Sequence, residues 1–593
     1  MIKNFIITNF EKLNFKNYSN LFFYDNLLYN LYEKNNLKKH NSKYIKIFKI
    51  YNKNYNFKYY RKKLNYYLKS LSVNLNKIHN RKYSIKTWGL QIEYFVSVLL
   101  NLIFLNIINS KEKKILKKNI KSNDIYFIGK EDSNNYFYDT AEFVDSIEEP
   151  SSATIFYLRK RIIEDHLNKN KIRYFRKKSH QKEEQNYKRN YFYNLKIFFK
   201  EKILFNLIQL FVIIFKPCVL LDAYAGSKIS FKILLKSRFK LMLLPSKIFF
   251  KKDNFKLKKN EILRKQLLIK EKDYVDKLFN IFLFDFFPAS FLENFQINFQ
   301  QMNIYKKSIK VIGSAICLIS NDLYKILASL ILRNKGKLIT FDHGGFLHQE
   351  NNIKINDFIE KKYSNKIYHL NNKRGLGLNF LTKLDEKKNN SIKSKNILLV
   401  QTYLSSQPLY TNGDILVEKN MYNSNLLFKF YPLLDDKLKK ITNVKMFPNN
   451  DKNTKEKWIR LFNNKKNIFE ERYLFNKEVI NKNKLFVLDD ISTPLVEFLH
   501  LDAPFIIIIK KKDLNFYNKL NKKYLLKLNK KNLIFFSHID AAKFINKNIE
   551  NIQRWWGDII LNRNFINFKK NLFPVNKNFS KEIIKEFKEL NYI

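Results

Sequence analysis

The segment Thr340–Phe346 places an acid, an imidazole and two glycines in direct succession. It reads Thr-Phe-Asp-His-Gly-Gly-Phe and overlaps the end of an apolar stretch, Lys337–Phe341, that is typical of a strand. Glycine is scarce in this chain, at 11 of 593 residues, and paired glycines let a backbone turn sharply close to a ligand. His343 could act as a general base or donate a hydrogen bond to a phosphate. The alternative is a tight turn in which Asp342 and His343 satisfy local hydrogen bonds.

A second segment, Asp489–Glu497, combines a strand end with a helix start. Its sequence is Asp-Asp-Ile-Ser-Thr-Pro-Leu-Val-Glu. Ser492 and Thr493 are favoured caps, and a proline near the first helical position is typical of a helix N-terminus. Free amides and hydroxyls at such a start suit a phosphate or diphosphate, and Glu497, about one turn further on, could reach ribose hydroxyls. The alternative is an ordinary capped helix.

Two further segments carry weaker signals. The sequence Lys-Phe-Tyr-Pro at 429–432 ends a predicted strand with a basic residue, Lys429, and an aromatic one, Tyr431. The Trp-Trp pair at 555–556 holds two of the four tryptophans. For this pair we favour a packing anchor between domains over a platform for a ligand.

Motifs with a fixed spacing for cofactors or metals are missing from the sequence. It contains no GxGxxG, no GxxxxGK[ST], no HExxH and no CxxC. The adjacent acids Asp489 and Asp490 would point in different directions on a strand, which favours surface charge over a metal site. Cys218 and Cys317 are too few for a disulfide framework or a zinc cluster, and both lie in apolar runs. We therefore predict no metal site, no cofactor and two buried cysteines.

The elements that would position these residues begin at about residue 203, where apolar strands alternate with amphipathic helices. Helices are predicted at 321–333 and 494–500, and the polar stretch 351–394 indicates a connection between two such series. This alternation indicates parallel sheets, at whose carboxyl ends ligands bind. The predicted strands are 219–221, 240–244, 281–284, 310–312 and 337–341 in the first series, and 396–401, 426–431, 485–488, 504–509 and 533–535 in the second.

The first 200 residues are predicted to add helices to this framework. Strands are indicated at 5–8 and 125–128, and helices at 88–105 and 151–170. The apolar stretches 95–108 and 203–221 are too short or too interrupted to cross a bilayer, so both are predicted as buried helix. The N-terminus lacks the apolar stretch and cleavage site of a signal peptide, and two cysteines fit a reducing compartment. A cytoplasmic protein is the expectation.

A strong positive charge marks the composition. Lys and Arg number 111 against 53 Asp and Glu, a net charge of +58. One interpretation is a non-enzymatic protein that binds RNA or a membrane surface, which requires one contiguous basic face with exposed aromatic side chains. The interpretation we favour is base-composition drift, because Lys, Asn, Ile, Phe and Tyr are all abundant and share A/T-rich codons. Nucleic acid is then not an expected partner. Peripheral contact with anionic lipid at the inner face of the membrane is a consequence that the basic surface would allow.

Taken in order, these segments resemble a known family. The chain is similar to transferases encoded in bacterial surface-polysaccharide gene clusters, a family first named from a Leptospira protein, and more distantly to transferases of the GT-B type. The resemblance runs nearly end to end. Its segments are Phe5–Thr8, Lys86–Leu90, Ser151–Ile163, Phe287-Pro288, Phe291–Glu293, Gly313-Ser314, Asn321-Asp322, His343–Gly345, Lys429–Pro432, Ser492-Thr493, Glu497 and Trp555-Trp556.

The resemblance implies an α/β fold of two Rossmann-like domains, GT-B-like, whose parallel sheets face an interdomain cleft, with helical N-terminal additions. The implied boundaries are an acceptor-side domain at 1–350 and a linker at 351–394. A nucleotide-donor domain would follow at 395–550, and a helical segment at 551–593.

The activity implied is metal-independent transfer of a sugar or sugar-like group from a nucleotide-activated donor to a surface-glycan or lipid-linked acceptor. His343 would act as base towards the acceptor hydroxyl or stabilise the leaving phosphate, since protein groups can supply such help without a metal. Asp342 stands where the family usually has Gln, so a catalytically degenerate transferase is a further alternative. The implied site residues are Lys429, Tyr431, Ser492, Thr493 and Glu497 on the donor side, and Asp342, His343, Gly344 and Gly345 on the acceptor side.

Overall fold

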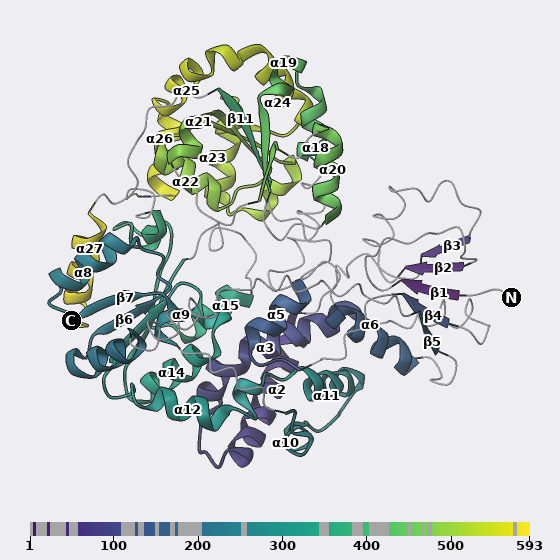
Figure 1. The fold of residues 1–593 in the computed structure, drawn as a ribbon, viewed down its shortest axis with the longest axis vertical. Helices are drawn as coiled ribbons and strands as arrows, with labels where there is room; N and C mark the ends of the chain where they lie inside the picture. Colours follow the sequence, from purple (N-terminus) through teal and green to yellow (C-terminus); the bar gives the residue numbers. More distant parts are fainter. Residues whose placement is uncertain are drawn as a thin grey trace, which may run out of the picture.

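Three parallel sheets, each accompanied by helices, make up the part of the chain that the computed structural model describes (Figure 1). Parallel strands need a crossover of a dozen or more residues between them, and the helices supply most of these crossovers. The described residues are 4–7, 20–23, 43–46, 57–107, 125–128, 136–148, 153–166, 172–175, 204–250, 258–342, 355–381, 395–401, 426–446, 452–463, 466–470, 477–572, 574 and 578–593.

The first sheet is built by the N-terminal part of the chain, with strand order β3-β2-β1-β4-β5. Asn4 pairs with Asn20 on one side and with Ile125 on the other, both in parallel register. The strands predicted at 5–8 and 125–128 are therefore confirmed, and they are neighbours. Two strands and otherwise helices were predicted for this region, so the five-stranded sheet is an addition to that prediction. Its other three strands were missed because they are short and lie in Asn- and Lys-rich sequence. The strands are β1 (Asn4–Ile7), β2 (Asn20–Phe23), β3 (Lys43–Lys46), β4 (Ile125–Ile128) and β5 (Ile172–Phe175).

Helices between these strands pack into the core of the second sheet. Helix α3 (Ile85–Asn106) contacts α14 (Asp322–Arg333) and α15 (Ile355–Tyr363). Its stretch Ile85–Phe104 is long and apolar enough to cross a membrane, yet nearly all of it is buried inside the protein. That burial confirms the predicted core helix. The other helices of this region are α2 (Phe57–Ile78), α5 (Thr140–Glu148) and α6 (Ala153–His166).

The second sheet has the strand order β10-β9-β8-β6-β7. Four of its strands match the predictions at 219–221, 240–244, 310–312 and 337–341. The strands are β6 (Cys218–Leu221), β7 (Leu241–Leu244), β8 (Val311–Ser314), β9 (Lys337–Phe341) and β10 (Lys366–Tyr368). Besides α14 and α15, the helical segments around it are Leu204–Phe215, α8 (Ser227–Lys236), α9 (Ser246–Phe249), α10 (Glu261–Leu267), α11 (Tyr274–Phe286), η4 (Ala289–Phe291), α12 (Phe295–Asn303), α13 (Cys317–Ser320) and η6 (Leu376–Leu381).

Two segments of this region differ from the predictions. The strand predicted at 281–284 is part of α11, which Asp273 caps by accepting a hydrogen bond from the Asp276 amide at 3.1 Å. Because α11 is buried over much of its surface, its apolar run has no clear period to distinguish helix from strand. Within the stretch 351–394, expected as a linker, residues Ile355–Tyr363 form α15 and residues Lys366–Tyr368 form β10 at the edge of the second sheet.

The third sheet has the order β13-β12-β11-β14-β15-β16 and is also parallel throughout. The strand predicted at 426–431 is wrong: residues Leu426–Phe430 form the helix α18, and β12 takes the place beside β11. The strands are β11 (Asn396–Val400), β12 (Thr442–Met446), β13 (Ile468–Glu470), β14 (Asn483–Leu488), β15 (Phe505–Ile508) and β16 (Ile534–Phe535). The helical segments are α18, η8 (Tyr431–Leu433), α19 (Asp436–Lys440), α20 (Lys452–Phe462), α21 (Lys477–Lys482), α22 (Thr493–Leu501), η9 (Lys511–Phe516), α23 (Lys519–Asn529), α24 (His538–Asn548) and η10 (Ile549–Asn551).

The C-terminal helices divide between two sheets. Helices α25 (Ile552–Ile560) and α26 (Arg563–Leu572) stay with the third sheet, where Trp556 donates from Nε1 to the Asp502 carbonyl at 2.9 Å. The tryptophan pair therefore packs within this part of the molecule rather than between domains. Helix α27 (Phe579–Glu589) returns to the second sheet and lies beside α8 (Figure 1).

Candidate functional site

The third sheet has its topological switch point between β11 and β14. From β11 the strand order runs outward through β12 and β13 on one side, and through β14, β15 and β16 on the other. Ligands of open parallel sheets bind at the carboxyl ends of the two strands where this order reverses. β14 ends at Leu488 and is followed by Asp489-Asp490-Ile491-Ser492. The segment predicted from its helix-start pattern thus lies at the position that the topology favours.

Ser492 is the N-cap of α22 but does not cap it with its hydroxyl. Its backbone is extended, at φ −141°, and its side chain makes no cap hydrogen bond. The hydroxyl oxygen is shielded from solvent and has no hydrogen-bond partner among the described residues. Its carbonyl accepts from the Leu495 amide at 3.0 Å, which begins the helix. A hydroxyl at a helix N-terminus that is not used for the helix is available to an anion bound there.

The acids around Ser492 are buried rather than solvated. Asp489 is fully buried, and Glu497, on the second turn of α22, is 3% exposed. Asp490 accepts from the Ile491 amide at 2.7 Å and so holds the turn between strand and helix. Adjacent acids were predicted to be surface charge, and the burial of Asp489 and Asp490 contradicts that prediction, because both follow a fully covered central strand.

Lys429 and Tyr431 belong to the helical segments α18 and η8 and not to a strand end. Tyr431 is buried against Phe462 and Trp458, with ring centroids 4.5 Å and 6.3 Å away, and this burial raises the pKa of its hydroxyl. It is a core residue. Lys429 is exposed and lies near His538, because α18 packs on α24.

His538 is a site candidate that the sequence analysis missed. It is the first residue of α24, directly after β16, and Ser537 caps this helix by accepting from the Asp540 amide at 3.3 Å. Burial, and then the positive charge of Lys429, lower the pKa of His538. The imidazole is therefore neutral at physiological pH, at the same carboxyl edge of the sheet as Ser492. The sequence signal that could have indicated this helix start is Ser537, which follows the predicted strand 533–535 and precedes Asp540 by three residues.

On the second sheet, Asp342 directly follows β9 and is buried. Its carboxylate accepts from the Leu370 amide at 2.6 Å, and its other oxygen is 3.5 Å from Nδ1 of His369. The Asp342 amide donates to the Tyr368 carbonyl at 3.0 Å. Asp342 thus fixes the segment after β10 against the end of β9. The neighbouring candidates His343, Gly344 and Gly345 lie outside the described residues.

A second buried acid lies close to Asp342. Glu360 of α15 is 2% exposed, and burial, followed by the negative charges of Asp342 and Asp357, raises its pKa well above the ordinary value. Burial and the neighbouring carboxylates thus both favour the protonated form of this carboxyl. Within the described part of the chain, no group of three His, Cys, Asp or Glu side chains is arranged to hold a metal ion.

The second sheet has its own switch point, between β6 and β8, which the sequence analysis did not single out. Asp222, after β6, accepts from Sγ of Cys317 at 3.3 Å and from the Ser246 amide at 2.8 Å. Asp222 and Tyr224 both have left-handed backbones, at φ 46° and 58°. For a tyrosine this conformation costs about 1–2 kcal/mol and is often kept at functional sites.

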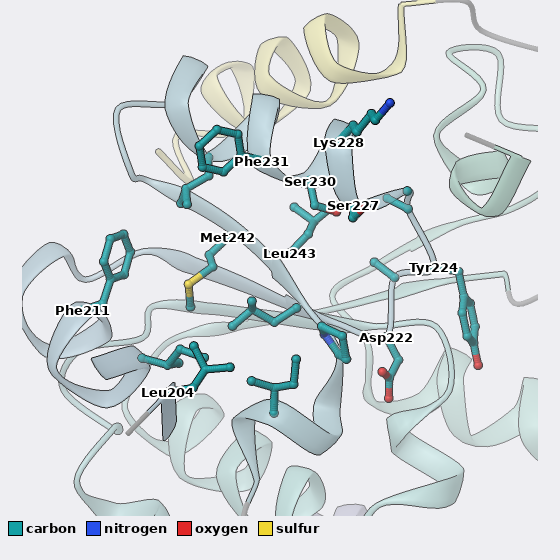
Figure 2. Close-up of a pocket in the computed structure, with 18 of the residues that line it drawn as sticks. Leu204, Phe211, Asp222, Tyr224, Ser227, Lys228, Ser230, Phe231, Met242 and Leu243 are labelled. Carbon is teal, nitrogen blue, oxygen red and sulfur yellow. The ribbon is translucent and has the colours of Figure 1, made fainter. Parts of the chain in front are cut away.

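A groove of about 1030 Å³ opens beside this loop (Figure 2). Its polar end holds Asp222, Tyr224 and Ser227, and Lys228 and Ser230 of α8 also line it. Most of the other lining side chains, from the helix Leu204–Phe215, α8 and β7, are apolar. Figure 2 shows the labelled side chains of Leu204, Phe211 and Met242 at the end away from Asp222.

The comparison with protein families decides between an enzyme and a purely basic binding protein. A family model described as LIC12162 family transferase matches residues 4–587. The chain belongs to this family of transferases. The match confirms the resemblance inferred from the ordered segments, and it extends over all three sheets.

Two solved structures resemble this family member over about two thirds of its length. An S. aureus MnaA–UDP co-structure is 11% identical at a TM-score of 0.33, and covers 64% of this chain and 98% of its own. A structure of the wall teichoic acid polymerase TagF, soaked with CDPG, is 10% identical at a TM-score of 0.31, and covers 63% of this chain and 90% of its own. No curated protein sequence matches the chain. The assignment of the chain to its family therefore rests on the family model.

Proposed function

We propose that this transferase moves a sugar or sugar-like group from a nucleotide-activated donor to a hydroxyl of a surface-glycan or lipid-linked acceptor, on the cytoplasmic side of the membrane. In this reaction the acceptor oxygen attacks the activated carbon of the sugar, its proton passes to a base, and the nucleoside diphosphate leaves. The donor would bind at the carboxyl edge of the third sheet and the acceptor at that of the second.

The observation that carries the donor side is the Ser492 hydroxyl, which is shielded from solvent at a helix N-terminus and has no hydrogen-bond partner among the residues that the structure describes. A diphosphate placed there would accept a hydrogen bond from Ser492, from Thr493 and from the free amides of the first turn of α22. Lys429 adds positive charge at the same edge of the sheet, and neutral His538 can donate a hydrogen bond to phosphate. We keep Glu497 as the residue that contacts the ribose hydroxyls. Because its side chain is buried, the ribose would have to enter the protein surface to reach it.

On the acceptor side, His343 is the proposed base, with Gly344 and Gly345 allowing close approach of the acceptor. Asp342 acts on this segment as a positioning residue, because its carboxylate joins the end of β9 to Leu370. We assign stabilisation of the leaving diphosphate to protein groups, namely the α22 N-terminus and Lys429, so that no metal is required.

Ser492→Ala tests the donor site, with Ser84→Ala as its matched control. Ser84 caps α3 by accepting from the Thr87 amide at 3.2 Å, whereas Ser492 caps nothing. Ser84→Ala should cost about 1 kcal/mol of stability and leave nucleotide binding unchanged. Ser492→Ala should leave stability within about 0.5 kcal/mol and weaken binding of nucleoside diphosphates at least tenfold, because a hydrogen bond to a charged group is lost. Thermal shift against UDP, CDP, GDP and their sugar conjugates measures both.

Equal nucleotide affinity in the wild-type protein and Ser492→Ala would remove the donor site from this helix. Stabilisation of the wild-type protein by none of the nucleotides would favour the catalytically degenerate alternative.

His343→Ala tests the base independently. Transfer to an acceptor, or hydrolysis of the donor, should fall by about 10²- to 10⁴-fold while nucleotide affinity stays as in the wild-type protein. Near wild-type turnover in this variant would exclude His343 from the mechanism.

A further inference from the structure

The helix Leu204–Phe215 is apolar on its solvent face as well as on its packed face. Val212 is fully buried, and Ile208 and Phe211 pack against the core. On the other side, Leu207 and Leu210 are more than half exposed. A surface helix normally presents polar residues outward, so an apolar outer face indicates a partner.

The apolar surface continues from this helix onto α8. Of the 19 large hydrophobic side chains that are exposed in the described part of the chain, seven lie between residues 204 and 235. We call this set the apolar patch: it comprises Leu204, Leu207, Leu210, Ile213, Ile214, Phe231 and Leu235. Leu204, Leu207 and Phe231 also line the groove, so the patch and the groove share these three side chains. Leu204 and Phe231 are labelled in Figure 2.

Positive charge accompanies the apolar patch. Between residues 204 and 250 the only acidic residue is Asp222, which accepts its hydrogen bonds at the inner end of the groove. The same stretch carries seven exposed basic residues, which are Lys216, Lys228, Lys232, Lys236, Arg238, Lys240 and Lys247. Lys228, Lys232 and Lys236 recur every four residues along α8, next to Phe231 and Leu235.

We propose that the apolar patch and the lysines of α8 dock this protein on an anionic membrane, with the helix Leu204–Phe215 in the interface. An interfacial helix buries its apolar face at the boundary of headgroups and acyl chains, while neighbouring basic side chains meet anionic headgroups. A symmetric contact between two copies through this patch would instead bring the lysines of α8 towards those of the other copy. The charge therefore favours a lipid surface over a second copy of the chain.

The docking surface adjoins the carboxyl edge of the second sheet. Its groove runs from the apolar patch to Asp222 and Tyr224 at the switch point. If the proposed function holds, an acceptor carried by a membrane lipid would reach the acceptor side without leaving the bilayer. The docking itself does not depend on which nucleotide the enzyme uses.

The test is binding of the full chain to vesicles, measured by co-sedimentation at about 0.15 M salt. One set of vesicles contains phosphatidylcholine with about 30% phosphatidylglycerol, and the other contains phosphatidylcholine alone. The wild-type protein should bind the anionic vesicles at least about tenfold more tightly, since each lysine near the surface contributes about 1 kcal/mol.

Paired variants separate the apolar and the electrostatic contributions. Leu210→Gln/Ile214→Gln should lower the partition coefficient at least about tenfold. Lys232→Gln/Lys236→Gln should lower it about 20- to 30-fold, with a weaker dependence on salt. The matched controls are Leu561→Gln/Ile262→Gln, at sites 78% and 70% exposed, and Lys523→Gln/Lys527→Gln, which has the same spacing on α23. Both controls should bind like the wild-type protein.

Equal binding of patch variants and controls would overturn the proposal, as would equal binding of the wild-type protein to neutral and anionic vesicles. The proposal would also be overturned if the wild-type protein does not bind vesicles but forms a dimer in sedimentation velocity that Leu210→Gln/Ile214→Gln dissociates. The patch would then be an interface between two copies of the chain. Thermal shift with nucleotides should be unchanged in the patch variants, so this outcome is independent of the donor-site test.

Discussion

At the scale of single residues, the segments that carried the family resemblance separate into structural and chemical ones. Asp322, predicted only as a helix start, accepts from the Thr140 amide at 2.8 Å and from the Ser290 hydroxyl at 2.6 Å, and it pairs with Lys325 at 2.8 Å. Three segments distant in sequence therefore meet on one buried carboxylate. In the same way, Arg264 binds the Glu293 carboxylate through Nε at 2.7 Å. These positions stabilise the core around the second sheet, whereas the Ser492 hydroxyl makes no hydrogen bond within the described part of the chain.

The buried pair of Asp322 and Lys325 gives a stability prediction. Asp322→Ala should cost about 3–5 kcal/mol, because it leaves the Lys325 ammonium, which is fully buried, without its carboxylate. Asp322→Ala/Lys325→Met should recover most of this loss, since both charges then leave the core. Urea unfolding followed by tryptophan fluorescence, to which Trp88 in this same core contributes, measures the change in free energy.

The control for this pair is Lys277→Ala on the surface of α11, where the lysine side chain is 47% exposed and pairs with Asp165. Its cost should stay below about 1 kcal/mol. A double variant as unstable as Asp322→Ala would show that the hydrogen bonds to Thr140 and Ser290, and not the stranded charge, dominate.

At the scale of elements, a helix or strand could be predicted where its burial leaves a recognisable pattern of apolar and polar residues in the sequence. The strands around β6, β9, β11 and β14 were predictable as short apolar runs between turn-forming residues. The runs at 281–284 and 426–430 were not, because helices buried on most sides lose the polar stripe that distinguishes them from strands. The Asp489–Ser492 edge could be predicted because a cap and a proline mark a helix start in sequence. The proximity of Lys429 to His538 could not, since it arises from the packing of α18 on α24.

At the scale of the whole molecule, α27 joins the C-terminal end of the chain to the second sheet. Phe579, Ile583 and Phe587 are buried in the core that contains β6, β7 and β8. Glu586 accepts from Tyr368 at 3.1 Å and forms ion pairs with Lys366 and Arg374. Because the chain passes through the third sheet before α27, this attachment limits how far the second and third sheets can separate.

The ion pairs of Glu586 make this attachment dependent on pH. Burial alone would raise the pKa of Glu586, but hydrogen bonds from Lys366 and Tyr368, together with the charge of Arg374, lower it below the ordinary value of 4.5. A lowered pKa in the folded state means that the carboxylate stabilises the attachment above pH 4.5, and that this contribution is lost as the pH falls through the lower, folded value.

Hydrogen exchange of residues 578–593, normalised to an unstructured peptide at each pH, should therefore rise steeply below about pH 4.5. Glu586→Gln should exchange about tenfold faster than the wild-type protein at pH 7, because charge-assisted hydrogen bonds are lost, and should not show the acid step. If hydrogen exchange in Glu586→Gln rises below pH 4.5 as much as in the wild-type protein, other carboxylates cause that rise. Helix α27 would then be held by its apolar face alone.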